Sequence, residues 1–109
     1  MATQNQPIVV KIEYRNNEEE TLSVETLENF YIIKKDDKNF KMTKKGVKIF
    51  LLKTFQNMWD EEIQNIIFSC SGIEKYIFVE TSEFEVDYKN EIEEEIDFFL
   101  EFQLETFLF

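Results

Sequence analysis

The sequence predicts an α+β protein in which an antiparallel sheet of about five to six strands packs one face against one long or two short helices at about residues 44–71. Three patterns lead to this fold class. Apolar and polar residues alternate over Ile8–Tyr14, as in a strand with one buried face. Apolar residues recur at helical spacings of three and four from Val47 onward. Alternation then returns over residues 83–108, so we expect the single domain, residues 1–109, to end in an acidic β-hairpin.

The N-terminal part predicts one strand and one extended segment. Residues 1–6 are polar, and we expect them to be disordered ahead of the strand at Ile8–Tyr14. After a polar loop, residues 21–24 read as extended. The alternative there is a short helix capped within residues 23–27, because a serine at the start of a helix can accept a hydrogen bond from its first turn.

Residues 30–42 predict a β-hairpin. Residues 30–35 are rich in β-forming side chains, and the next four, Asp36-Asp37-Lys38-Asn39, are typical of a turn. Beyond this turn, Phe40 and Met42 alternate with lysines, as in a second strand with one apolar face.

A helix is predicted after Thr43, whose side chain can cap its first turn. Its apolar stripe consists of Val47, Leu51, Phe55, Met58 and Trp59. Lys44 and Lys45 are unfavourable beside the positive end of a helix dipole, so a strand at residues 47–52 is the alternative.

A second helical segment is predicted to begin at Asp60-Glu61-Glu62, where acids suit the helix dipole, and to stop at Gly72. Its apolar residues are Ile63, Ile66, Ile67 and Cys70. Whether it continues the first helix through a kink or forms a second one stays open. Residues 73–80 are apolar on both faces, which predicts a strand in the middle of the sheet.

Residues 83–108 suggest a function. Most even positions are apolar and most odd positions acidic, and the apolar residues from Phe98 to Phe109 scatter around a helical wheel. We therefore expect two strands joined by a turn at Lys89 and Asn90. One face then carries a ladder of carboxylates that repel one another, so folding alone does not explain it. This exposed row, with three rings that interrupt or end it, comprises Glu83, Glu85, Asp87, Glu91, Glu93, Glu95, Asp97, Phe99, Glu101, Glu105, Phe107 and Phe109. The alternative is a merely solvated acidic surface whose rings are covered by another element.

The charge of the chain limits its partners. A net charge of −11 argues against direct binding to nucleic acid or to an anionic membrane, both of which require a basic surface. Residues 34–53 carry eight lysines and two acids, whereas residues 54–109 carry fifteen acids and two lysines. We expect a basic protein as partner, or a second copy in which these two regions meet.

No catalytic or cofactor motif is visible. The chain has no histidine, so an ordinary zinc site is excluded and nothing can activate Cys70 as a cysteine-protease nucleophile. Two glycines, Gly46 and Gly72, do not make a phosphate-binding loop, and one cysteine makes no disulfide. The N-terminus lacks a signal-peptide pattern and no apolar run reaches the length of a membrane span. We expect a cytoplasmic protein, in the host cell if phage-encoded, with no metal, cofactor or enzymatic activity.

In size and charge the chain resembles small acidic phage inhibitors of CRISPR effectors and restriction enzymes, although no residue motif carries this likeness. The resemblance implies a nucleic-acid mimic whose carboxylates pair with lysines and arginines of a nucleic-acid-binding effector or nuclease. Two alternatives stay open: an immunity protein that neutralises a basic bacterial toxin, and a self-associating structural or assembly protein.

Overall fold

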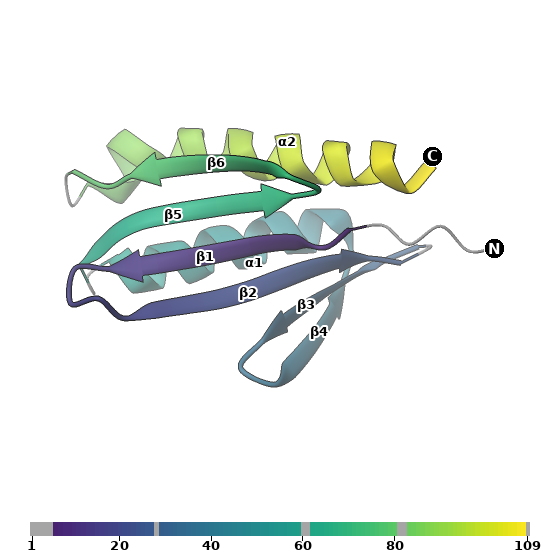
Figure 1. Cartoon of the computed structure of the whole chain (residues 1–109), viewed down its shortest axis with the longest axis horizontal. Helices are drawn as coiled ribbons and strands as arrows, with labels where there is room; N and C mark the ends of the chain where they lie inside the picture. The colour runs from purple at the N-terminus through teal and green to yellow at the C-terminus, as the bar shows by residue number, and fades with distance from the viewer. Residues whose placement is uncertain (1–5, 28, 60–61, 81–82, 109) are drawn as a thin grey trace.

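The computed structural model describes residues 6–27, 29–59, 62–80 and 83–108, with side chains described as far as Gln103. Its elements are β1 (Ile8–Tyr14), β2 (Glu19–Thr26), β3 (Tyr31–Lys35), β4 (Lys38–Met42), α1 (Lys44–Met58), β5 (Ile63–Cys70), β6 (Ile73–Phe78), the π-helical segment η2 (Phe84–Tyr88) and α2 (Lys89–Leu108). The six strands form one sheet in the order β4-β3-β2-β1-β5-β6, and every neighbouring pair is antiparallel. Both helices lie behind the strands in Figure 1, so the predicted α+β class is confirmed.

The first four strands follow the predicted pattern. In β1, Val10 and Ile12 are fully buried, while the alternating residues Val9, Lys11 and Glu13 are half-buried. β2 runs to Thr26, so the alternative of a short helix at residues 23–27 is wrong. The predicted hairpin is β3–β4, and Asp36 and Asp37 at its turn have φ angles of +50° and +65°. Two residues with positive φ make a turn whose twist matches that of the strands it joins.

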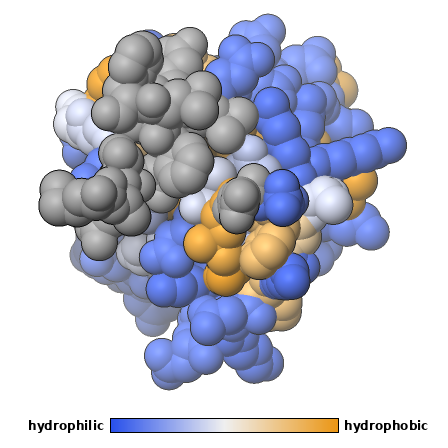
Figure 2. Space-filling view, turned by 90° about the vertical axis from the view of Figure 1, so that its right-hand side faces the viewer, coloured by the Kyte–Doolittle hydropathy of each residue, from blue (hydrophilic) through white to orange (hydrophobic). Residues whose placement is uncertain are grey.

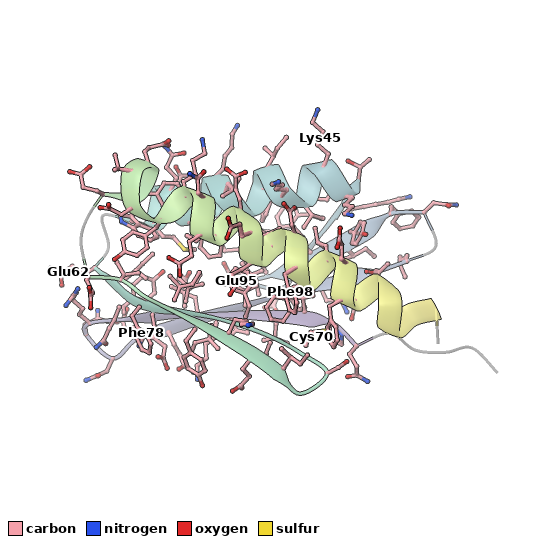
Figure 3. The ribbon with its side chains drawn as sticks, turned by 90° about the horizontal axis from the view of Figure 1, so that it is seen from above. Lys45, Glu62, Cys70, Phe78, Glu95 and Phe98 are labelled. Carbon is pink, nitrogen blue, oxygen red and sulfur yellow. The ribbon has the colours of Figure 1, made fainter. Side chains whose placement is uncertain are left out.

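The predicted helix after Thr43 is confirmed as α1. The Thr43 hydroxyl oxygen accepts a hydrogen bond from the Gly46 backbone N–H at 3.1 Å. The stripe is buried as expected at Val47, Leu51, Phe55 and Met58, so the alternative strand at residues 47–52 is wrong. Figure 3 shows Lys45 pointing away from the sheet, where its charge is solvated.

The helix predicted over residues 60–71 is wrong, because Ile63–Cys70 forms strand β5. β5 lies between β1 and β6 and is apolar on both faces at its centre, where Ile66 and Phe68 face the helices and Ile67 faces the other side. Gly72 does not stop a helix either: Ser71 and Gly72 have φ angles of +49° and +86° and form the two-residue turn into β6.

The strand predicted at residues 73–80 exists as β6, but it lies at an edge of the sheet and not in its middle. Only its inner face is covered, since Ile77 is 1% exposed while its neighbours Tyr76 and Phe78 are 51% and 65% exposed. The apolar residues on the outer face of β6 are therefore exposed, and the inference from apolar residues on both faces to a central strand is wrong.

The predicted C-terminal acidic β-hairpin is wrong, because η2 and α2 together make one helical segment. No turn occurs at Lys89 and Asn90, where α2 begins. The buried side chains lie at spacings of three, four and one, which place them on one side of a helix: Tyr88, Ile92, Ile96, Phe99, Leu100 and Gln103. This side packs on the sheet.

Three aromatic residues hold the start of this segment. The Trp59 ring lies 4.8 Å from that of Phe84 and 5.2 Å from that of Tyr88, measured between ring centroids. The Tyr88 hydroxyl also accepts a hydrogen bond from the Glu80 backbone N–H at 2.6 Å. These contacts fix where the chain turns from β6 into η2.

Phe99 is in the core, so the prediction that it is an exposed binding residue is wrong. It is 0% exposed and its ring stacks on that of Phe68 in β5, with centroids 5.8 Å apart. Phe68 in turn meets Phe55 of α1 at 6.1 Å. The three rings link both helices to the middle of the sheet.

The first residues described lie beside the end of α2. The backbone carbonyl of Gln6 accepts hydrogen bonds from the Gln103 side chain at 3.0 Å and from the Cys70 thiol at 3.5 Å. Residues 1–5, on which most of the predicted disorder falls, lie outside the described ranges. Within those ranges, no helix is both long enough and apolar enough to cross a membrane.

Candidate functional site

The predicted acidic residues lie along η2 and α2 and point in several directions. Between residues 83 and 101 the sequence has nine carboxylates and one lysine. On a helix these carboxylates are divided among two flanks and an outward side, whereas a hairpin would have placed them on one face. Each group therefore has different neighbours.

The flank that faces α1 is partly neutralised. Lys48 Nζ of α1 lies 3.0 Å from the Asp97 carboxylate and 3.7 Å from that of Glu93. The hydrogen bond to Asp97 is the main cause that raises the pKa of Lys48, which stays charged. One lysine of residues 34–53, Lys48, thus pairs with acids of α2 within one molecule. In η2, Glu85 pairs with Lys89 at 3.6 Å and accepts a hydrogen bond from Gln56.

The flank that faces β6 combines a carboxylate, a lysine and a ring. Burial raises the pKa of Glu95, the charges of Glu91 and Glu94 raise it further, and Lys75 of β6 lowers it. The ammonium of Lys75 also lies 5.6 Å from the centroid of the Phe98 ring. Figure 3 shows Glu95 and Phe98 on the side of α2 that faces the strands.

The outward side holds Glu91, Glu94 and Glu101, which we call the acidic face. All three are exposed, and within the described part of the chain none of them lies in an ion pair. At 1.5 Å of rise per residue they extend over about 15 Å of helix. Their charge is available to a partner, in contrast to that of Glu93 and Asp97.

The other predicted binding residues have different positions. Glu83, just before η2, and Asp87 in η2 are exposed, whereas Phe99 is buried. The side chains of Glu105 and Phe107 and all of Phe109 lie outside what the structure describes. The prediction missed Glu94, because an even position contradicts the strand pattern, although a helical reading would have placed it on the acidic face.

The described residues outside η2 and α2 form a surface depression and include a buried thiol. The depression is lined by Tyr14, Asn16 and Glu18–Glu20, so its polar groups are a phenol, an amide and carboxylates. Cys70 is buried, and burial raises the pKa of its thiol, so the thiolate nucleophile is disfavoured. Among the described residues, no three metal-ligating side chains gather into a cation site. Figure 2 shows the end of the molecule that carries the chain termini, where hydrophilic side chains surround a smaller apolar area.

Comparisons with known proteins give no information about the function of this chain. No family model matches the chain, and neither a curated protein nor a solved structure matches it.

Replacing Glu95 with glutamine tests the electrostatics of the acidic helix. Because the folded-state pKa of Glu95 is raised above its ordinary value of 4.5, the native protein binds more protons than the unfolded chain as pH rises past that value. Stability from this group is present at low pH and is lost as pH rises through the folded-state pKa. We expect Glu95→Gln and wild type to melt alike near about pH 4 and the variant to melt higher near about pH 7. Thermal unfolding followed by circular dichroism measures this, and a variant that melts lower near about pH 7 would show that the attraction of Lys75 outweighs the burial.

Proposed function

We propose that the protein is a small acidic inhibitor that mimics nucleic acid and blocks the basic nucleic-acid-binding surface of a larger protein. The observation that carries this proposal is the acidic face, where Glu91, Glu94 and Glu101 lie exposed and outside the ion pairs along one side of α2. A phage-encoded inhibitor of a CRISPR effector or a restriction enzyme is the biological role that this chemistry suits best. The protein acts by binding and not by catalysis.

A rigid acidic helix suits this role physically. Glu91 and Glu94 are three residues apart, which places their Cβ atoms about 5–6 Å apart, and Glu101 follows about two turns further along the helix, so the three carboxylates can contact one row of lysines and arginines at once. The buried side of α2 fixes the helix on the sheet, so little ordering is needed when a partner binds. The excess negative charge of the whole molecule attracts a basic partner over a distance of about one Debye length, roughly 8 Å at physiological salt.

The immunity protein is a second candidate that uses the same surface. It differs in its partner, a basic toxin of bacterial origin in place of a defence enzyme. Identifying the partner therefore separates the two: the tagged protein is incubated with bacterial lysate at low salt, and captured proteins are identified by mass spectrometry. The proposal requires a basic nucleic-acid-binding protein whose DNA or RNA binding is competed away by the purified chain.

Charge reversal then tests the acidic face. We expect Glu91→Lys with Glu94→Lys and Glu101→Lys to slow association with the captured partner about tenfold or more, because exposed charges steer encounter. Surface plasmon resonance at two salt concentrations measures the on-rate. The fold should be unchanged in circular dichroism, since all three side chains are exposed.

A matched control has the same change in net charge elsewhere. Glu18, Glu62 and Glu80 are exposed and lie outside η2 and α2, so their replacement by lysine reverses three charges away from the acidic face. The control variant should keep most of the wild-type on-rate. Equal losses in the two variants would mean that net charge alone drives association, and the assignment to α2 would have to be abandoned.

A further inference from the structure

The two edges of the sheet differ in how they are protected against pairing. β4 at one edge has the sequence Lys38-Asn39-Phe40-Lys41-Met42, and lysines are a common means of keeping an edge strand from pairing. β6 at the other edge carries the exposed charges Glu74 and Lys75 in its first half, but its second half presents Tyr76 and Phe78 on the uncovered face at 51% and 65% exposure. Figure 1 shows β6 along the top of the sheet with no strand beyond it. The β6 edge is therefore the one suited to pairing.

The hydrogen-bond register shows which groups of β6 are turned outward. The Val79 backbone N–H donates to the Gln64 carbonyl at 2.9 Å, and this pair continues the register of Ile66 with Ile77. Hydrogen-bonded pairs alternate with non-bonded ones in an antiparallel ladder. Residues 73, 75, 77 and 79 thus bond to β5, and the N–H and C=O groups of Glu74, Tyr76 and Phe78 point away from it.

The same residues carry the exposed rings. Tyr76 and Phe78 stack on each other with centroids 6.2 Å apart and an angle of 19° between the rings. Ile67 of β5 lies beside them, directly opposite Tyr76. A strand added to this edge would gain main-chain hydrogen bonds and a ready-made aromatic surface together.

We propose that β6 pairs with β6 of a second copy, antiparallel, about a two-fold axis at Ile77. Tyr76 of each copy then faces Phe78 of the other, so four rings form one cluster on the uncovered side of a continuous twelve-stranded sheet. The outward N–H and C=O groups of these residues meet in two hydrogen-bonded pairs. Cross-strand aromatic pairs of this kind stabilise a sheet.

Other symmetric registers fit less well. An axis at Lys75 places the two Lys75 side chains directly opposite each other and sets each Tyr76 ring against Glu74. The axis at Ile77 sets Glu74 of each copy opposite Glu80 of the other, so the rings, and not the charges, separate the two registers. An axis at Tyr76 pairs only the two Tyr76 rings and sets each Glu74 carboxylate against a Phe78 ring. The axis at Ile77 is the one that pairs every exposed ring of β6 with a ring.

The dimer is expected to be weak and to tighten with salt. At about 200 Å² for a whole aromatic side chain, the two rings bring roughly 200 Å² per copy to the contact, so the total lies below the roughly 1,200 Å² of a stable complex. The charges near the edge of each copy include three acids, Glu74, Glu80 and Glu95, and one lysine, Lys75, so two net negative edges meet across the axis and repel. Added salt screens this repulsion. Self-association by contact of α2 acids with lysines 34–53 would instead weaken with salt. The salt dependence of the dimer affinity therefore has opposite signs for pairing at β6 and for contact between acids and lysines.

Two cysteine substitutions test the register directly. In a hydrogen-bonded antiparallel pair the Cα atoms are about 5.5 Å apart, within the disulfide range of about 4.4–6.8 Å. An equal mixture of Tyr76→Cys and Phe78→Cys should give a covalent dimer of the two variants on mild oxidation, because each mixed pair sets the cysteine at position 76 opposite the one at position 78 and keeps one Phe78 opposite one Tyr76. Neither variant alone should cross-link. Cys70 is buried, so wild type serves as the uncross-linked control. Cross-linking by Tyr76→Cys alone would place the axis at Tyr76 and overturn the proposed register.

Removing one outward N–H tests the edge. Tyr76→Pro deletes a donor that points away from β5, and proline is tolerated at such edge positions. Asn39→Pro is the matched control on β4. The Leu27 N–H donates to the Phe30 carbonyl, so alternate residues from Phe30 onward bond to β2, and Ile33 bonds to Phe40 of β4 instead. The N–H of Asn39, next to Phe40, therefore points away from β3. Sedimentation equilibrium from about 10 µM to about 1 mM should show a rising mass for wild type and Asn39→Pro and a constant monomer mass for Tyr76→Pro.

A second variant covers the case in which proline disturbs the strand. Tyr76→Lys gives β6 the protection that β4 has and changes only an exposed side chain, and Val86→Lys makes a similar change on η2, where Val86 is 78% exposed. We expect Tyr76→Lys to lose the dimer and Val86→Lys to keep it. A wild-type protein that stays monomeric up to about 1 mM at high salt overturns the proposal, as does a dimer that survives Tyr76→Lys. Neither result bears on the acidic face, because all these changes lie outside α2.

Discussion

Phe99→Ala is expected to lower the free energy of unfolding by about 3–5 kcal/mol, the range for removing a fully buried phenylalanine. The Phe99 side chain is 0% exposed and lies between the Phe68 ring at 5.8 Å and the Phe98 ring at 5.1 Å. Alanine would leave a cavity where α2 meets the middle of the sheet. In a chain of this size the melting temperature should fall by at least about 10 °C, measured by differential scanning calorimetry.

Phe98→Ala is the control for that loss. Phe98 is the preceding residue on α2 but is 41% exposed, so its removal should cost about 1 kcal/mol. If both variants melted within a few degrees of each other, Phe99 would not be the core residue that its burial indicates. A loss of partner binding in folded Phe99→Ala would also contradict the structure, since the ring has no exposed surface with which to bind.

The helical segment η2–α2 was predicted as strands because most of its buried residues recur every four positions. Phe84, Tyr88, Ile92, Ile96 and Leu100 all have even numbers, and a spacing of four fits a period of two as well as a period of 3.6. The positions between them separate the two readings. The second predicted strand needs an apolar residue at position 94, where the chain has Glu94, whereas a helix exposes this position.

The prediction at β5 failed for a related reason. Ile63, Ile66, Ile67 and Cys70 have helical spacing, yet the run Ile66-Ile67-Phe68 is also that of a strand buried on both faces. Gly72 did not decide between them, because glycine ends helices and also occupies two-residue hairpin turns. By contrast, β1, the β3–β4 hairpin and α1 were predictable, since in each the hydrophobic period agreed with the turn or cap beside it.

The candidate site was predictable in composition but not in geometry. The excess of acid in the last third of the chain is visible in the sequence, and the structure keeps most of it on the surface. Which acids are already paired depends on Lys48, which lies far away in sequence and reaches Glu93 and Asp97 only because α1 lies beside α2. Likewise nothing in the sequence marks Gln103 as a buried polar residue.

Gln103→Leu is expected to destabilise the protein by about 1–3 kcal/mol, although it places an apolar residue in an apolar setting. Gln103 is 0% exposed and its side-chain amide donates to the Val24 carbonyl at 2.9 Å, while its oxygen accepts from the Thr26 hydroxyl. Leucine removes these bonds and leaves buried polar atoms on β2 with fewer partners. Removing one partner of a buried hydrogen bond is more costly than removing both.

The same asymmetry gives the decisive measurement. Adding Thr26→Val to Gln103→Leu removes the buried hydroxyl as well, so the double variant should recover part of the lost stability. Urea denaturation of wild type, both single variants and the double variant gives the coupling free energy between the two side chains. We expect a coupling of about 1 kcal/mol or more in the direction of recovery. Losses that simply add would show that the two side chains do not share a bond, and, among the described hydrogen bonds, the one to the Val24 carbonyl would then hold Gln103 on β2.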